Sequence, residues 1–260
     1  MNHLVVDLET IPDVHAGRRL LNLDGLSDAE VAQAMALVRR GETSHSDFMR
    51  HTLHEIVCIS CVLRHGDQLR VWSLSREQAS EAEMLQRFFA GMERYTPVLI
   101  TWNGLGFDLP VLAYRTLLHG ITAEIFWDQG ERDASFRYNN YLSRYHQRHI
   151  DLMDVLSFYQ PRAAQPLDHV ASMLGFPGKM GMSGAEVWPA WLRGEIQHIR
   201  TYCETDVMNT WLVFLRFQKM RGWLDEAQLK HEESKLQELL AASNEPVWQE
   251  FLKQWTNSHE

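Results

Sequence analysis

The stretch His3-Leu4-Val5-Val6-Asp7-Leu8-Glu9 decides the fold of this chain. It begins with a short apolar run, partly β-branched, which indicates a buried strand close to the N-terminus. Side chains two residues apart on a strand point to the same face, so Asp7 and Glu9 are expected to converge at the strand's end. Two carboxylates a few Å apart raise each other's pKa unless a cation lies between them, and hard oxygen ligands suit Mg²⁺ or Mn²⁺. Taken alone, the pair is more simply explained as two solvated acids at an exposed strand end.

Length and composition describe an ordinary globular chain. The sequence has 260 residues, of which 45% are hydrophobic and 23% charged, which suits one large domain or one domain with an appendage. We see no apolar run long enough for a membrane span and no secretion signal, so we expect a cytoplasmic protein without membrane contact. The formal net charge of −9 argues against a protein that coats nucleic acid, because binders of the phosphate backbone tend to be basic. An enzyme that uses a local basic patch and bound cations remains compatible with this charge.

The cysteines do not predict a metal or redox site. Cys58 and Cys61 form a C-x-x-C inside the apolar run 56–63, which is typical of a central strand. Residues three apart on a strand face opposite sides, and neither a second C-x-x-C nor an H-x-H cluster completes a zinc site. We therefore expect buried, unreactive thiols.

The hydrophobic pattern beyond the first strand predicts an α/β fold with a mixed sheet. Further strands are expected at 55–64, 69–74 and 97–101, and helices at 79–95, from Asp108, up to Phe158, at 166–174 and at 194–219. Residues 14–54 are expected to form a helical insertion, in which His45, His51 and His54 are surface residues. The expected division is one domain over 1–220 and a C-terminal helical extension over 221–260.

Two later stretches carry acids in informative contexts. Asp108 follows Trp102-Asn103-Gly104-Leu105-Gly106-Phe107, where two glycines allow a tight turn from strand to helix. A carboxylate at a helix start is favoured by the dipole, so a capping role alone explains Asp108. Tyr202 and Asp206 lie four apart on the expected helix and share one face, which makes Asp206 a half-buried acid that needs a partner.

The segment 128–149 interleaves basic and aromatic side chains. Arg137, Tyr138, Tyr141 and Arg144 are its candidate substrate contacts, because such mixtures occur where phosphates and bases are bound together. The alternative is an ordinary surface segment whose tyrosines pack on the domain. The glycine-rich loop 175–184 has no nucleotide-binding spacing.

Together, Asp7-x-Glu9, the N-x-x-x-F-D of residues 103–108 and the Y-x-x-x-D of residues 202–206 resemble the three motifs of the DEDDy 3′–5′ exonucleases. These belong to the DnaQ-like, ribonuclease H-like superfamily, which includes the proofreading domain of family B DNA polymerases. The chain also resembles stand-alone bacterial proteins described as predicted 3′–5′ exonucleases related to that domain. The resemblance covers roughly residues 1–220. It implies a ribonuclease H-like mixed sheet flanked by helices, followed by the C-terminal helical extension.

The resemblance also implies an activity: hydrolysis of single-stranded nucleic acid from a free 3′ end, releasing nucleoside 5′-monophosphates. DNA is favoured as the substrate and RNA stays open; no protein partner is indicated. Two Mg²⁺ or Mn²⁺ ions per site are implied. Asp7 would bridge both ions, Glu9 and Asp206 would complete the ligands of one, and Asp108 would hold the other through water. Tyr202 would orient the attacking water, because a phenol with a pKa near 10 is a poor base.

The same resemblance suggests substrate contacts for the side chains next to the acids. Leu8 and Thr10 would contact the terminal nucleotide, and Asn103 and Phe107 would line the cleft. Asp151 and Asp154 are interpreted as structural acids. Two alternatives remain: a catalytically silent nucleic-acid-binding protein of the same fold, which the presence of all five motif residues disfavours, and a structure-selective endonuclease.

Overall fold

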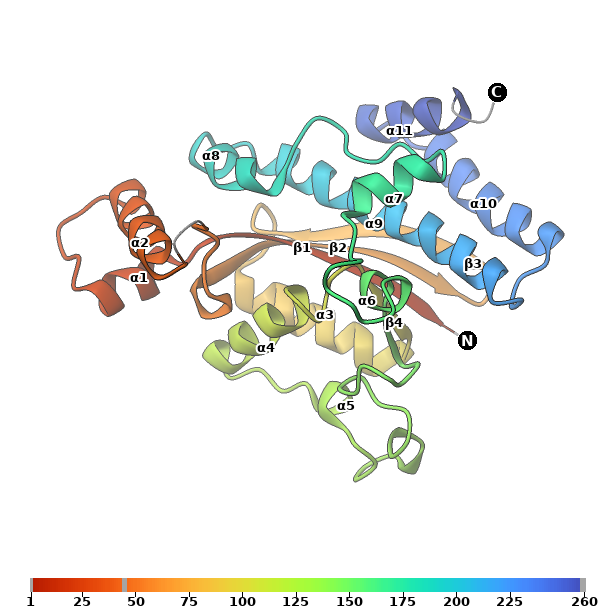
Figure 1. Ribbon diagram of the computed structural model, residues 1–260, viewed down its shortest axis with the longest axis horizontal. Helices are drawn as coiled ribbons and strands as arrows, with labels where there is room; N and C mark the ends of the chain where they lie inside the picture. Colours follow the sequence, from red (N-terminus) through yellow and green to blue (C-terminus); the bar gives the residue numbers. More distant parts are fainter. Residues whose placement is uncertain (1, 44–45, 258–260) are drawn as a thin grey trace.

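A central mixed β-sheet organises the molecule (Figure 1), for which a computed structural model describes residues 2–43 and 46–257. Within these residues, five strands form one sheet in the order β3-β2-β1-β4-β5. Their bounds are β1 His3–Pro12, β2 His54–His65, β3 Gln68–Ser75, β4 Val98–Thr101 and β5 His149–Asp151. The β1–β2 and β2–β3 pairs are antiparallel, whereas β1–β4 and β4–β5 are parallel. The first strand predicted from the sequence therefore lies in the middle of the sheet.

Alternation along β1 sends its side chains into two separate cores. Leu4, Val6 and Leu8 pack into the core on one face, while Val5 belongs to the core on the other. Asp7 and Glu9 are two and four residues after Val5 on the same strand, so both carboxylates lie on that second face. The two-residue period of the strand thus decides which helices the acids meet.

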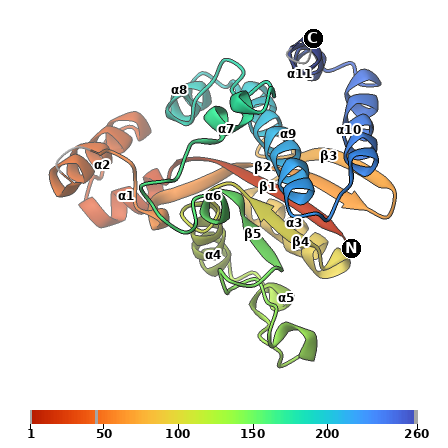
Figure 2. The same cartoon turned by 45° about the vertical axis from the view of Figure 1, so that its right-hand side comes forward.

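Helices cover both faces of the sheet (Figures 1 and 2). The first face packs against α3 (Glu81–Tyr95), α4 (Asp108–His119) and α5 (Glu124–Trp127). The second packs against α9 (Ile196–Met220), supported by α7 (Leu167–Met173), α10 (Glu226–Ala241) and α11 (Pro246–Asn257). This is the ribonuclease H-like α/β fold with a C-terminal helical region, as the sequence predicted. None of the helices in the described parts of the chain combines the length and apolar character that crossing a membrane requires.

The remaining elements lie near the ends of the strands. Beyond β1, α1 (Val14–Leu21) and α2 (Asp28–Thr43) form the left-hand lobe of Figure 1, and η1 (His51–Leu53) leads into β2. After β5 come α6 (Leu152–Leu156) and, beyond α7, the short η3 (Gly184–Glu186) and α8 (Val187–Leu192). The sequence did not predict β5, because three residues are too short to show a periodic pattern.

A buried ion network ties three of these elements together. Arg115 of α4 donates to Glu81 of α3 (Nε to Oε1, 2.7 Å) and to Asp13, which caps α1. All three residues are at most 5% exposed. The guanidinium therefore keeps two buried carboxylates compensated and anchors the start of the 14–54 segment to the domain.

Candidate active site

The site begins where β1 leaves its regular pairing with β2. Glu9 pairs with Cys58 but Thr10 pairs with Ile56, so the register shifts by one residue between Glu9 and Thr10. Such a bulge re-aims the side chains beside it. Ligand atoms of Asp7, Glu9 and Cys203 all lie within 4.8 Å of one another, which confirms the predicted convergence of the two acids.

Asp108 reaches β1 from the opposite face of the sheet. β1 pairs with β4 only up to Val5, so the N–H of Leu8 lies beyond that ladder. The Leu8 N–H donates to Asp108 Oδ1 at 3.1 Å, which places this carboxylate beside the main chain between Asp7 and Glu9. Asp108 is the first residue of α4, and Phe107 is the cap residue. The capping role considered from the sequence is therefore replaced by a bond to β1.

The third acid comes from α9. Tyr202 and Asp206 lie one turn apart on α9, and the Tyr202 hydroxyl lowers the pKa of Asp206, which is consistent with the shared face that their spacing predicted. Asp206 is half-buried, whereas Tyr202 is only 7% exposed. One turn of the same helix brings Cys203 to Asp7, and its thiol donates to Asp7 Oδ2 at 3.3 Å. Three segments that are far apart in the sequence thus meet at one point.

Burial raises the pKa of every acid in this cluster, and in Asp7 and Glu9 the neighbouring acids raise it further. Burial, followed by repulsion from Asp108 and Asp206, holds the pKa of Asp7 well above its usual range. Burial, and then the charges of Asp7 and Asp206, do the same to Glu9. Burial raises the pKa of Asp108 and of Asp206 to about 7 each, and in Asp206 the Tyr202 hydroxyl and Lys179 oppose the rise.

The same acids raise the pKa of the Tyr202 phenol. Burial contributes most, followed by the charges of Asp206, Glu9 and Asp7. Tyr202 therefore stays protonated, and its hydroxyl can donate or orient but cannot act as the base. The structure agrees on this point with the sequence argument.

The donor set fits divalent cations. Asp7, Glu9, Asp108 and Asp206 offer hard carboxylate oxygens, the ligands that Mg²⁺ and Mn²⁺ prefer. Across the described residues, neither Asp7 nor Glu9 forms an ion pair with a lysine, arginine or histidine. Buried like charges without a compensating cation are costly, and bound metal ions would remove that cost.

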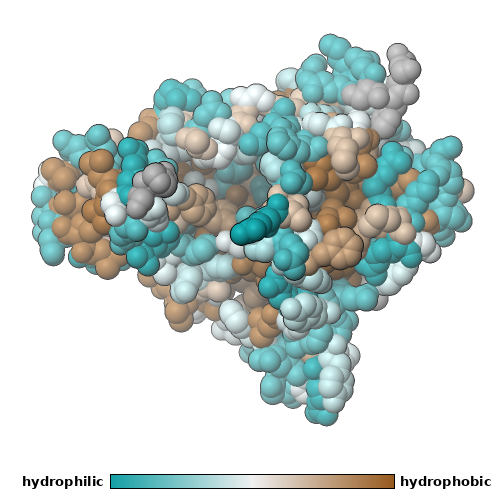
Figure 3. Space-filling model, viewed as in Figure 1, coloured by the Kyte–Doolittle hydropathy of each residue, from teal (hydrophilic) through white to brown (hydrophobic). Residues whose placement is uncertain are grey.

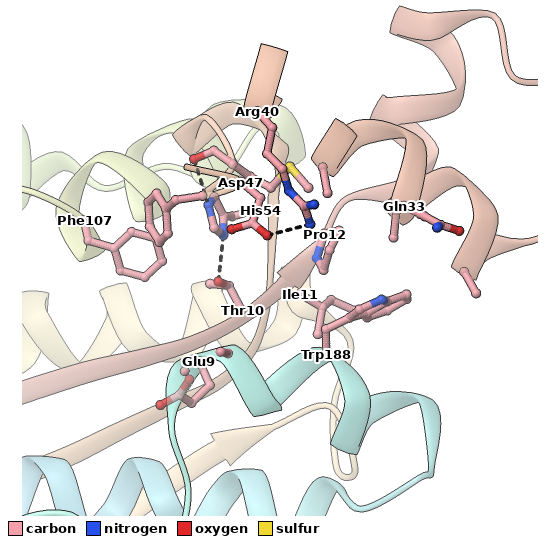
Figure 4. Close-up of a pocket in the computed structure, with 17 residues that line it drawn as sticks. Glu9, Thr10, Ile11, Pro12, Gln33, Arg40, Asp47, His54, Phe107 and Trp188 are labelled. Carbon is pink, nitrogen blue, oxygen red and sulfur yellow. Dashed lines mark hydrogen bonds and ion pairs between the residues drawn. The ribbon is translucent and has the colours of Figure 1, made fainter. Parts of the chain in front are cut away.

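A cavity of about 620 Å³ opens beside Glu9 (Figure 4). Its floor is β1 from Glu9 to Pro12, and its other walls come from α2, from residues 47–49 and from α8 with Trp188. Aromatic rings line one side: Phe107 stands edge-on to Phe48 at 5.4 Å and to His54 at 5.0 Å between ring centres. The pocket is thus continuous with the acids and apolar enough to hold a planar ring.

His54 corrects the expectation that the histidines of this segment lie at the surface; His45 falls outside the described residues. His54 is 7% exposed, and burial lowers its pKa to about 4, so its ring is neutral. Its Nε2 lies 3.3 Å from the Met49 carbonyl, which can only accept, so the Thr10 hydroxyl donates to Nδ1 at 2.8 Å. The ring therefore holds Thr10 in a set orientation on the cavity floor.

The predicted substrate contacts separate into different environments. Thr10 and Phe107 line the cavity, and the half-buried Asn103 lies in the turn before α4 with a φ of 62°. Leu8 is a correction, because its side chain is buried in the core and only its main chain takes part in the site. Tyr141 is a second correction: it is 1% exposed and its hydroxyl donates to the Pro97 carbonyl.

The other members of the 128–149 group are at the surface. Arg137 is exposed and Tyr138 is 83% exposed. Arg144 forms an ion pair with Asp154 at 2.6 Å. The four predicted substrate contacts of segment 128–149 therefore do not form one shared surface, because Tyr141 packs inside the domain.

Two supporting residues were not recognised as part of the site from the sequence. Asp151 accepts hydrogen bonds from the N–H groups of Asn103 (3.0 Å) and Leu105 (2.9 Å), so it holds the turn that presents Asp108. Lys179, from the glycine-rich loop, acts electrostatically on Asp206. The spacing of neighbouring residues connects neither Asp151 nor Lys179 to the motifs. The only indication in the sequence was the pair of acids Asp151 and Asp154.

Comparison with known proteins agrees with this geometry. A family described as "Predicted 3'-5' exonuclease related to the exonuclease domain of PolB" matches residues 46–255. The match includes Asp108, Tyr202 and Asp206, begins after β1 with Asp7 and Glu9, and extends through α10 into α11. A search of curated proteins finds no significant match. Because the family match spans most of the chain, the protein belongs to this family of predicted 3′–5′ exonucleases related to the exonuclease domain of PolB.

Proposed function

We propose that this protein is a metal-dependent 3′–5′ exonuclease that hydrolyses single-stranded nucleic acid, preferably DNA, and releases nucleoside 5′-monophosphates. The observation that supports this proposal most directly is the acidic cluster: Asp7 and Glu9 have ligand atoms within 4.8 Å of each other, and Asp108 of α4 and Asp206 of α9 are close enough for their charges to act on both. Membership of the exonuclease family supports it independently. Bound cations would relieve the repulsion between the ionised carboxylates, and a scissile phosphate needs the same cations.

Each acid has a distinct place in the proposed mechanism. Asp7, whose pKa responds to both Asp108 and Asp206, would help to hold both Mg²⁺ or Mn²⁺ ions, while Glu9 and Asp206 would help to hold one and Asp108 the other. When bound, the ions would stabilise negative charge on the phosphate and supply an acidic water. The protonated Tyr202 would position that water through its hydroxyl, which interacts with Asp206 one turn further along α9.

The cavity beside Glu9 gives the terminal nucleotide a place. Phe48 and Phe107 would stack on its base, and the Thr10 hydroxyl, oriented by His54, would contact the sugar or phosphate. An unpaired base suits an aromatic-lined pocket, because stacking does not depend on the base's identity. The proposal therefore favours frayed or single-stranded 3′ ends over closed duplexes.

The direct test uses purified protein with Mn²⁺ or Mg²⁺ and an oligonucleotide labelled at its 3′ end. The label should be released as a mononucleotide, and Asp7→Ala should abolish the release. Equal release by the variant would indicate a contaminating nuclease and reject the proposal. Cleavage of a circular single strand would favour an endonuclease, since a circle has no end. Binding without cleavage would favour the catalytically silent alternative.

A further inference from the structure

The connection between α6 and α7, residues 157–166, joins the two sides of the candidate active site. At one end, Asp151 caps α6 and holds the Asn103–Leu105 turn before Asp108. At the other end, Asp168 accepts from the Lys179 N–H at 2.7 Å, and both side chains act on the charge of Asp206. Figures 1 and 2 show the connection running between α6 and α7. The side chains of residues 157–166 therefore belong to a segment whose two ends are connected to the residues around Asp108 and Asp206.

Neither packing nor backbone conformation explains why a phenylalanine stands at position 158 of this connection. It is 82% exposed, so its ring gains little from packing. Its φ is 54° and that of Tyr159 is 60°, in the left-handed region that favours glycine. The hydrogen bond from the Tyr159 N–H to the Asp154 carbonyl explains the turn, but such a turn suits glycine or asparagine better than phenylalanine. A large apolar ring held in a disfavoured conformation at the surface indicates a binding role.

Aromatic and basic side chains cluster around Tyr159, the neighbour of Phe158 in the chain. Tyr145 and Tyr159 meet edge-on at 5.3 Å between ring centres, and the Arg144 guanidinium lies 5.1 Å from the centre of the Tyr159 ring. Tyr145 is 72% exposed. Arg162 is exposed and forms no ion pair with any residue in the described ranges. In Figure 3, apolar side chains are exposed around α6 beside strongly hydrophilic ones.

We infer that these residues form a second substrate-binding surface, which we call the aromatic platform: Arg144, Tyr145, Phe158, Tyr159 and Arg162. Its ligand is the single strand on the 5′ side of the terminal nucleotide. A base stacks on Phe158, and the two arginines bind the phosphates on either side. This inference rests on the proposed function, because only a 3′–5′ exonuclease would place the 3′ end of the nucleic acid at the acids and its 5′ side on the platform. It differs from the sequence-based prediction, of which only Arg144 is kept: Tyr145 is added from the same segment, and Phe158, Tyr159 and Arg162 come from beyond β5.

Charge supports a nucleic-acid ligand over an apolar protein partner. The whole chain carries a formal net charge of −9, yet the platform includes Arg162, which has no ion-pair partner among the described residues, and Arg144, which pairs with Asp154 and lies over the Tyr159 ring. Alternating stacking surfaces and cations are typical of grooves that bind single strands without sequence preference. An acidic enzyme needs such a local basic surface to hold a polyanion near its own carboxylates.

The test is binding of a single-stranded oligothymidine of about 12 nucleotides, labelled with fluorescein at its 5′ end, measured by anisotropy in EDTA. Phe158→Gly should weaken binding by about 5- to 150-fold, the range expected for the loss of one stacked base. Phe158→Tyr, which keeps a ring, should bind like the wild type. The loss should shrink for a dinucleotide, because it has fewer bases and phosphates left for the platform once its 3′ nucleotide occupies the cavity.

Two controls separate binding from folding. Phe158→Gly suits the left-handed backbone, so its melting temperature should be no lower than that of the wild type. Trp223→Ala removes another exposed aromatic ring stacked with an arginine, 3.8 Å from Arg221, beyond the far end of α9, and should not change binding. Unchanged binding by Phe158→Gly, or no binding by the wild type, would overturn the inference. Loss of affinity in a protein without nuclease activity would reject the proposed function and keep the platform.

Discussion

Replacing Asp7 with asparagine is expected to make the metal-free protein more stable and the enzyme inactive. The substitution removes one charge from the acidic cluster while keeping the shape of the side chain and an oxygen that can accept from Cys203. The two effects have one cause, because the repulsion that destabilises the empty cluster is what binds cations. Opposite changes in stability and activity are typical of functional residues.

The size of the stability gain follows from the geometry. Ligand atoms of Asp7 and Glu9 lie within 4.8 Å, where two unit charges repel by about 3.5 kcal/mol at an effective dielectric constant of ~20. Protonation of the cluster and the partial exposure of Asp7 reduce this figure. We expect a net gain of about 1–3 kcal/mol at pH 8 in EDTA, or roughly 3–10 °C in melting temperature.

The gain should depend on pH in a definite direction. The carboxyl pKa values of the cluster are raised by folding, so the folded state binds more protons than the unfolded state and loses stability as pH rises. For Asp108 and Asp206 this loss runs from about pH 4, near the ordinary value of 3.8, to about 7. The advantage of Asp7→Asn should therefore be small near pH 4 and largest above pH 7.

Differential scanning calorimetry across this pH range, with and without Mn²⁺, is the measurement. Mn²⁺ should raise the melting temperature of the wild type most at high pH, and it should do so far less in the variant. The control is Asp24→Asn, an exposed acid in the turn after α1, which should change neither stability nor activity. If Asp7→Asn lowers the melting temperature in EDTA at pH 8, the argument from repulsion is wrong.

Two further predictions concern the hydroxyl beside the cluster and the buried network behind it. Tyr202→Phe should lower kcat by about 10- to 100-fold, the value of one hydrogen bond to a charged group, with little change in KM or in the melting temperature. A loss that follows the ionisation of a phenol in the pH–rate profile would contradict the positioning role. Arg115→Met should cost about 3–5 kcal/mol of unfolding free energy in urea denaturation, because it removes the guanidinium that compensates two buried carboxylates and leaves Glu81 with His119 as its only ion-pair partner among the described residues. Arg132→Met, which breaks only exposed ion pairs, should cost about 0–1 kcal/mol, and equal losses in the two variants would refute the burial argument.

Local patterns in the sequence predicted much of the fold. Alternation on β1 and the apolar runs of β2, β3 and β4 were recognised because a strand with a buried face shows its two-residue period directly. Cys58 and Cys61 were placed on opposite faces of β2 for the same reason, and they lie in different cores. The three-residue β5 was missed because a strand so short has no period.

The motif residues of the candidate site could also be identified from the sequence. The pairs Asp7/Glu9 and Tyr202/Asp206 each lie within one element, so the geometry of a strand or a helix already places their members on one face. Asp108 was recognised from its turn and from the resemblance, but its bond to the Leu8 N–H was not. That bond exists because β1 continues past β4, which depends on the register of the sheet.

The sequence by itself determined the chemistry of the site: which carboxylates and which hydroxyl the chain has, and on which elements. Only the tertiary structure decided what surrounds them. Tyr141 is buried in the core, Phe158 is exposed, and His54 is buried with its ring hydrogen-bonded to Thr10. The physical reason is that burial depends on which segments meet after the chain has folded back on itself, and such contacts leave no mark in the spacing of neighbouring residues.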